Sequence, residues 1–160
     1  VAYQHHEHQD GPGYPRGLRG TNRIMARKEA LAEETGMIHR YAAVVAVPDY
    51  YDELTSNLPY RPALPPEVAI QRLRAASGTL LNSAVVEAFI SYLPVFPLGT
   101  LVICQNGEFS GWKGVVVRIN ASDLSRPVVR FLNDRKKKLP EPVDIDLRGQ
   151  ADLTLKTIWK

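Results

Sequence analysis

Two adjacent histidines, His5 and His6, are the residues whose types and spacing point most directly to chemistry. Neutral imidazole is a good ligand for first-row divalent metals. At the end of a helix, successive side chains point about 100° apart, so adjacent histidines there serve two neighbouring ions more naturally than one. A histidine pair without further context is more often a pair of exposed surface residues that bind no metal. The residues around it therefore decide whether it is a metal site.

The histidines open a longer motif that runs to Pro15. It consists of His-His-Glu, two residues, Asp-Gly, one residue and then Gly-Tyr-Pro, and its glycines supply backbone freedom. A second motif, Asp-Tyr-Tyr-Asp-Glu-Leu-Thr-Ser, begins at Asp49, and Pro-Tyr-Arg-Pro follows at residues 59–62. These motifs resemble the HD-GYP family, whose helix has the form Asp-x-Tyr-Asp-Ala-Leu-Thr-Ser. The resemblance covers residues 3–94.

The resemblance implies a metal-dependent phosphodiesterase that hydrolyses cyclic di-GMP in bacterial second-messenger signalling. Matched to the family's motifs, His5, His6 and Asp49 are the expected metal ligands and catalytic residues. The family holds two or three divalent ions, iron or manganese, and these stabilise the developing charge on the phosphate oxygens. An oxygen ligand mixed with imidazoles suits such ions.

The same match implies roles for neighbouring residues. Arg61 is expected to contact substrate, because guanidinium matches phosphate geometry bidentately. Asp52 is either a second substrate contact or a structural hydrogen-bonding group. Glu7 is expected to support the histidines, and the Gly-Tyr-Pro edge is an expected contact for GGDEF synthase domains. The whole motif loop comprises Glu7, Asp10, Gly11, Gly13, Tyr14 and Pro15.

The chain departs from the family pattern in two places. Leu58 stands where the family usually has an arginine, and residues 22–37 form a longer segment than many members have. The family's other metal ligands, including its His-Asp doublet, would lie upstream. We therefore expect this chain to be the C-terminal part of the domain and to be inactive on its own. The alternative is a catalytically degenerate member that acts as a signalling or partner-binding module.

The residues that carry these motifs require helices to position them. Strong helix formers occupy 27–35, and apolar residues at helical spacing favour a helix over a buried strand at 37–54. A helix is expected at 65–78, where proline and an acid occupy the first turn. Another is expected to begin after an N-cap at Asn82 or Ser83 and to end before Pro94. His8 and His39 are expected to be exposed or capping histidines rather than ligands.

Beyond residue 97 the apolar period changes from near 3.6 to 2, which predicts strands. The expected class is therefore α+β, with a mainly helical bundle at 1–96 followed by a small antiparallel β-module at 97–160. Asn106-Gly107 is a tight-turn dipeptide, and the basic run 135–138 is interpreted as a solvated turn. Five short strands are expected, at 100–104, 114–119, 128–132, 143–147 and 153–159.

Composition limits the other classes of function. The formal net charge of +3 does not call for nucleic acid. Nucleic-acid binding by the basic run would need aromatic residues beside the charge, for which Trp112 and Phe131 are the candidates. The longest apolar run, 42–48, is too short to cross a membrane. A single cysteine, Cys104, which is expected to be packed, favours a reducing compartment, and the expected location is the cytoplasm.

Overall fold

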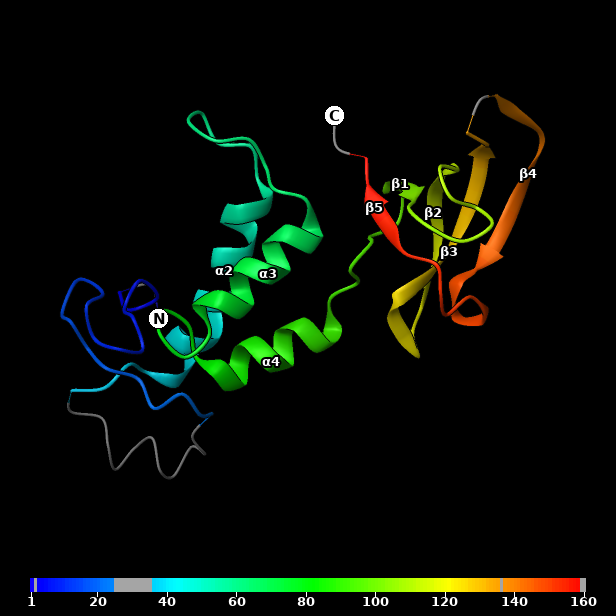
Figure 1. Ribbon diagram of the computed structural model, residues 1–160. Helices are drawn as coiled ribbons and strands as arrows, with labels where there is room; N and C mark the ends of the chain where they lie inside the picture. Colours follow the sequence, from blue (N-terminus) through cyan, green and yellow to red (C-terminus); the bar gives the residue numbers. More distant parts are fainter. Residues whose placement is uncertain (2, 25–35, 136, 159–160) are drawn as a thin grey trace. The chain divides into compact units, whose positions relative to one another are not determined.

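The computed structural model describes residues 1, 3–24, 36–135 and 137–158 (Figure 1). The chain divides into two compact units, Val1–Tyr92 and Leu93–Lys160. The expected helix at 27–35 lies outside the described residues. Three helices in the first unit and five antiparallel strands in the second confirm the α+β class for the part of the chain that is described.

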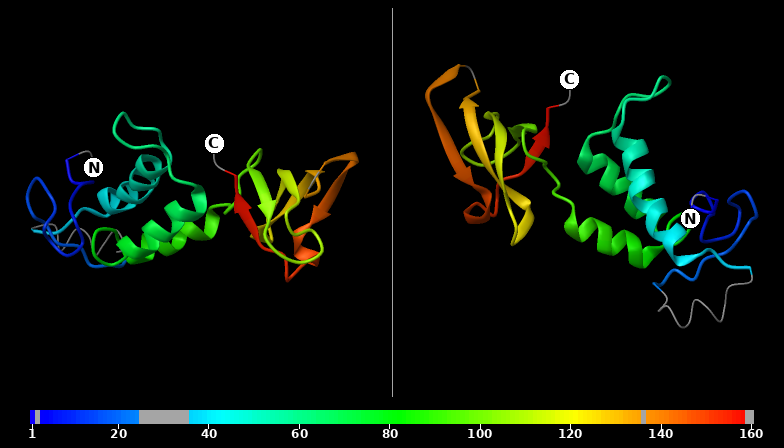
Figure 2. Two further views of the ribbon diagram at one scale, coloured as in Figure 1. Left: turned by 45° about the horizontal axis from the view of Figure 1, so that its top comes forward. Right: turned by 180° about the vertical axis from the view of Figure 1, so that it is seen from behind.

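The helical unit is built from α2 (Arg40–Thr55), α3 (Pro66–Ala76) and α4 (Ser83–Tyr92). α2 contacts both other helices, and Figure 2 shows the three from two further sides. The helical interpretation of 37–54 is confirmed and the strand alternative is wrong. The buried stripe of α3 recurs at helical spacing, which explains why this segment folds onto its neighbours; it comprises Ala69, Ile70, Leu73 and Ala76.

Side chains from outside the helices fix where two of them begin. The Nδ1 atom of His39 accepts a hydrogen bond from the Tyr41 amide at 3.3 Å, so His39 caps α2, as expected. The Oδ1 atom of Asn82 accepts from the Val85 amide at 3.2 Å and caps α4 in the same way. Both caps satisfy amides that a helix N-terminus leaves without an intrahelical partner.

The β unit is one five-stranded antiparallel sheet in the order β4-β3-β2-β1-β5. Consecutive strands pair from β1 to β4, and the last strand returns to pair with the first (Figure 1). Phe96, Cys104, Val129 and Phe131 are among the residues of its core, so Cys104 is packed, as expected. The five expected strands are confirmed as β1 (Leu101–Cys104), β2 (Lys113–Asn120), β3 (Asp123–Asn133), β4 (Lys138–Asp146) and β5 (Leu155–Thr157).

The connection between β1 and β2 is longer than the tight turn expected at Asn106-Gly107. It spans residues 105–112, and the Asn106 side chain binds the segment before β5. Its Oδ1 atom accepts from the Thr154 amide at 2.7 Å and from the Thr154 hydroxyl at 2.9 Å. Asn106 thus holds two distant segments together. No described helix is long and apolar enough to cross a membrane.

Acid should weaken the β unit through Asp146, which precedes the short 3-10 helix Leu147–Gly149. Hydrogen bonds from Arg148, and a further one from Asn120, lower the Asp146 pKa from 3.8 to about 2. Because the folded-state pKa is depressed, the stabilisation is present above pH 3.8 and is lost as pH falls through about 2. We expect the thermal unfolding midpoint to fall across this window, less steeply in Asp146→Asn. The control is Asp152→Asn, which removes one exposed carboxylate from the same unit. If the unfolding midpoint falls equally steeply with pH in both variants, the prediction is wrong.

Candidate metal centre

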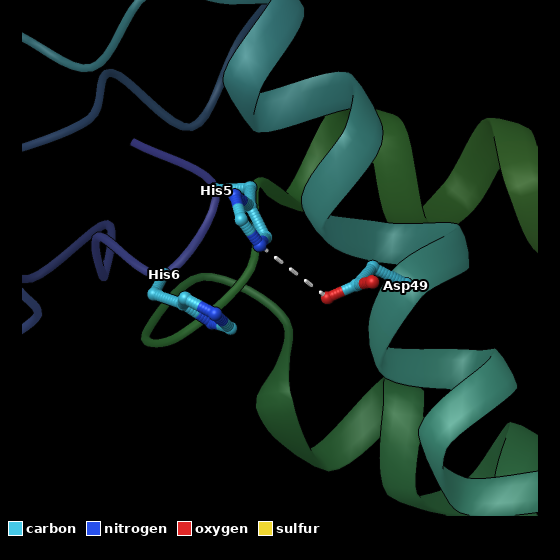
Figure 3. A group of neighbouring side chains, drawn as sticks. All are labelled: His5, His6 and Asp49. Carbon is cyan, nitrogen blue, oxygen red and sulfur yellow. Dashed lines mark ion pairs between the residues drawn. The ribbon is translucent and has the colours of Figure 1, made fainter. Parts of the chain in front are cut away.

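The structure brings His5, His6 and Asp49 together, although Asp49 lies far along the chain on α2 (Figure 3). One ligand atom from each side chain, a ring nitrogen of each histidine and a carboxylate oxygen of Asp49, lies within 4.8 Å of the other two. The Nε2 atom of His5 lies 4.0 Å from Oδ2 of Asp49. An octahedral ion with bonds of about 2.1 Å separates its ligand atoms by roughly 3–4 Å. Small side-chain rotations would therefore suffice to bring the three onto one ion.

The two histidines lie on a turn, not at the end of a helix. The Gln4 amide donates to the Val1 carbonyl at 3.0 Å, and the Glu7 amide donates to the Gln4 carbonyl at 3.1 Å. The His5 and His6 ring centroids are only 4.0 Å apart. Both side chains are directed toward α2 (Figure 3).

Glu7 fixes the motif loop from inside. Its side chain is buried, with 2% of the residue exposed, and its carboxylate accepts from the Arg16 amide at 2.7 Å and the Leu18 amide at 2.8 Å. A buried carboxylate is stable only when it is hydrogen-bonded. Glu7 therefore supports the histidines by holding the backbone that follows them.

Gly13 is required where the loop closes on itself. A Cβ atom at this position would lie 2.2 Å from the His8 amide nitrogen and 2.6 Å from the Glu7 Cα atom. Gly11 meets a different demand, because its φ of +103° lies in the left-handed region. Gly13 thus allows Glu7 and His8 to pack against the loop that follows them, and Gly11 allows the backbone of that loop to turn.

Gln9, which sequence reasoning missed, anchors the loop to the turn before α4. It is buried, its amide donates to the Leu80 carbonyl at 3.3 Å, and its Oε1 atom accepts from Nδ2 of Asn82 at 3.4 Å. The Asp10 amide donates to the Thr79 carbonyl at 3.0 Å, so Asp10 contributes its backbone while its side chain is exposed. These bonds join residues more than 60 positions apart, which local sequence patterns do not reveal.

A small cleft of about 90 Å³ opens at the three candidate ligands. Tyr14 stacks on His6 with ring centroids 4.8 Å apart, which orients that imidazole while 61% of Tyr14 stays exposed. Sequence reasoning missed Tyr50 and Glu53, and expected His8 to be exposed or capping, although it is half-buried here. Besides the candidate ligands and Tyr14, the cleft is lined by Glu7, His8, Ala46, Tyr50, Glu53, Leu80 and Leu81.

Spacing alone could have identified Glu53. It lies four residues after Asp49 on α2, and residues at this spacing share a helix face. It also stands where the family's helix has alanine. Glu53 therefore adds a further carboxylate to the lining of the cleft, which favours a cation there.

The structure does not bring Arg61 and Asp52 to this cleft. The Arg61 guanidinium donates to the Leu54 carbonyl at 3.2 Å and to the Glu53 carbonyl, so it binds the C-terminal end of α2. Asp52 is exposed, and its Oδ1 atom accepts from the Ser56 hydroxyl at 3.5 Å. Among the described residues that line the cleft there is no arginine or lysine.

The donor set fits a divalent ion of the first transition row. Two imidazoles and one carboxylate suit iron or manganese, and none of the three candidate ligands is fully buried. Three ligands occupy half of an octahedral shell, so other groups must complete it. Tyr14, Glu7 and Gly13 act on the histidines from outside the cluster by fixing the ring and the backbone.

No family model matches the chain. Cyclic di-GMP phosphodiesterase PA4108 of Pseudomonas aeruginosa is 31% identical over 155 residues, which cover 95% of this chain and 33% of that protein. A cyclic di-GMP phosphodiesterase of Thermotoga maritima is 39% identical over 90 residues, 56% of this chain and 20% of that protein. The cyclic di-GMP phosphodiesterase response regulator RpfG of Xanthomonas campestris is 37% identical over 90 residues, with the same coverages.

The chain thus spans about a third or less of the length of these relatives. The match to PA4108 covers nearly the whole chain and so includes the β unit, whereas the other two cover little more than half. The β unit is therefore shared with at least one relative.

Proposed function

We propose that this chain, which is similar to several cyclic di-GMP phosphodiesterases, belongs to the HD-GYP family and is part of a metal-dependent enzyme that hydrolyses cyclic di-GMP. The observation that carries the proposal is the convergence of His5, His6 and Asp49 at one cleft. Residues from two distant parts of the chain meet there with the donor types that iron and manganese prefer.

In this proposal His5, His6 and Asp49 hold a divalent ion at the mouth of the cleft. When bound, the ion supplies positive charge that polarises the phosphate and activates water. The half-buried His5 and the stacked His6 present ring nitrogens as ligands, while Asp49 and Glu53 contribute carboxylates that suit a cation. In the parent protein, two or three ions would be completed by residues outside this chain.

The cellular setting follows from the same proposal. Second-messenger hydrolysis places the protein in the bacterial cytoplasm, where the buried free thiol of Cys104 would stay reduced. The exposed edge at Tyr14 and Pro15 is the proposed contact for GGDEF synthase domains. Because the Tyr14 ring stacks on His6, a partner bound there would act directly on the metal centre.

One observation favours the alternative of a catalytically degenerate signalling module. Arg61 binds the end of α2, and Leu58 stands where the family usually has an arginine. The described lining of the cleft therefore offers the phosphates no cationic side chain, and an active enzyme would depend more heavily on its metals.

Metal removal separates the two functions. We expect the full-length protein to convert cyclic di-GMP to linear dinucleotide, to lose this activity after dialysis against a chelator, and to regain it with Mn²⁺ or Fe²⁺. The products would be followed by liquid chromatography. Absence of hydrolysis in the presence of both metals, with cyclic di-GMP binding retained, would favour the degenerate module.

A further inference from the structure

A separate pocket of about 460 Å³ lies on the β unit, between the end of the β1–β2 connection and the turn that joins β3 to β4. Its volume lies within the range of small-molecule sites, about 300–1,000 Å³. The basic residues Arg135 and Lys137 thus have the aromatic side chain of Trp112 beside them. Stacking on an aromatic side chain is the condition for recognition of a nucleotide base. The lining residues are Trp112, Asp134, Arg135 and Lys137.

Trp112 is held in place by other rings. Its indole meets Phe109 edge to face with centroids 5.0 Å apart, and it meets Phe131 in the same way at 5.9 Å. Phe131 is fully buried in the core of the sheet, whereas Trp112 is half-exposed. The indole is therefore a fixed platform that solvent reaches, and a base can stack on such a platform without ordering it first.

The cations of the pocket are also positioned. The Nε atom of Arg135 donates to the Ser110 carbonyl. Its aliphatic stem packs so closely on Gly111 that a Cβ there would lie 2.7 Å from the Arg135 Cγ atom. Lys137 is exposed at the same turn and supplies a second positive charge. A guanidinium and an ammonium at one rim suit a phosphate group.

The carboxylate of Asp134 also lines the pocket. Its Oδ1 atom accepts from the Lys137 amide at 2.8 Å, and a carboxylate has about four lone-pair sites. Guanine presents two adjacent donors, N1–H and the N2 amino group, which a carboxylate accepts together. Adenine presents an unprotonated N1 at the same edge, which a carboxylate repels. A carboxylate beside an indole therefore favours guanine.

We propose that this pocket binds a guanine nucleotide. Trp112 stacks on the base, Asp134 accepts from its N1–H and N2 amino groups, and Arg135 and Lys137 bind the phosphate. Lys136 lies outside the described residues and has no part in the argument. The inference rests on the proposed function in one respect: the nucleotide would be the substrate cyclic di-GMP or its guanine-containing products, which makes the β unit a regulatory site.

The test is a titration of the whole chain in the presence of a chelator, so that the metal centre does not contribute. The Trp159→Phe background leaves Trp112 as the one fluorophore of its kind, since the sequence has two tryptophans. We expect GMP to quench Trp112 fluorescence and to bind at least tenfold more tightly than AMP or inorganic phosphate. Cyclic di-GMP, used as a further probe, shows whether substrate or product is the tighter ligand.

Two variants assign the roles. Asp134→Asn keeps one acceptor for the Lys137 amide and should bring the GMP-to-AMP affinity ratio close to one. Lys137→Gln should weaken GMP tenfold or more, whereas Lys156→Gln, an exposed charge on β5, should not.

Three results would overturn the inference: equal affinity for GMP and AMP, an unchanged ratio in Asp134→Asn, or a guanine-free oligonucleotide bound as tightly as GMP. Because these titrations involve no metal and no hydrolysis, their failure leaves the proposed phosphodiesterase untouched. Conversely, loss of hydrolysis in metal-site variants leaves guanine binding intact.

Discussion

Replacing Asp49 by asparagine should lower the rate of cyclic di-GMP hydrolysis by the full-length protein about 10²–10³-fold, the range for loss of one group that stabilises developing charge. Asp49 is the carboxylate in the cluster with His5 and His6. A neutral amide oxygen binds a divalent ion more weakly than a carboxylate does, so the metal would be held less tightly. Initial rates at several Mn²⁺ concentrations measure the effect, and high Mn²⁺ should restore part of the rate.

The control removes one carboxylate from the same unit. Glu87 is exposed on α4 and lies outside the cleft, so Glu87→Gln should hydrolyse cyclic di-GMP at the parental rate. An Asp49→Asn variant that stays within twofold of the parent at every Mn²⁺ concentration would show that Asp49 holds no catalytic metal.

Gly13→Ala should damage both the stability of the helical unit and its metal affinity. The new Cβ would lie 2.2 Å from the His8 nitrogen and 2.7 Å from the Glu7 carbonyl carbon, and backbone atoms cannot rotate away as a side chain can. Over-packing of this kind costs about 1–3 kcal/mol. Because the loop follows the histidines directly, its shift should also weaken Mn²⁺ binding. Urea unfolding and a Mn²⁺ titration measure the two effects.

Gly149→Ala is the matched control. Nothing lies within 4 Å of a Cβ at Gly149, and this position does not have a left-handed φ. The same Gly-to-Ala change there should alter the free energy of unfolding by less than about 0.5 kcal/mol. Equal effects of the two substitutions would mean that the loop around Gly13 can relax at little cost and does not position the histidines.

Periodicity predicted the elements of this protein well, because burial on one face is recorded directly in the order of residues. The stripe of α3, from Ala69 to Ala76, and the alternation of β1 are both visible in the sequence. The segment 42–47 consists of three alanines and three valines, and it forms part of α2, as its helical spacing predicts.

The candidate site was predicted by its motifs, whereas the contacts that position it were not. His5, His6 and Asp49 could be named from the sequence, but the turn that directs both histidines to α2 could not. Arg61 shows the same limit. A tight turn at residues 58–61 brings the Arg61 guanidinium to the carbonyls at the C-terminal end of α2. No residue pattern in the sequence predicts this contact.

A Mn²⁺ titration of this chain, followed by the electron paramagnetic resonance signal of the free ion, tests whether His5, His6 and Asp49 bind a metal. We expect saturable binding of about one ion per chain through the three ligands that converge at the cleft. Asp49→Asn and His6→Ala should each weaken that binding at least tenfold, while Glu87→Gln should leave it unchanged. Indistinguishable Mn²⁺ binding by the parent chain and both ligand variants would show that Asp49 and His6 do not hold the ion.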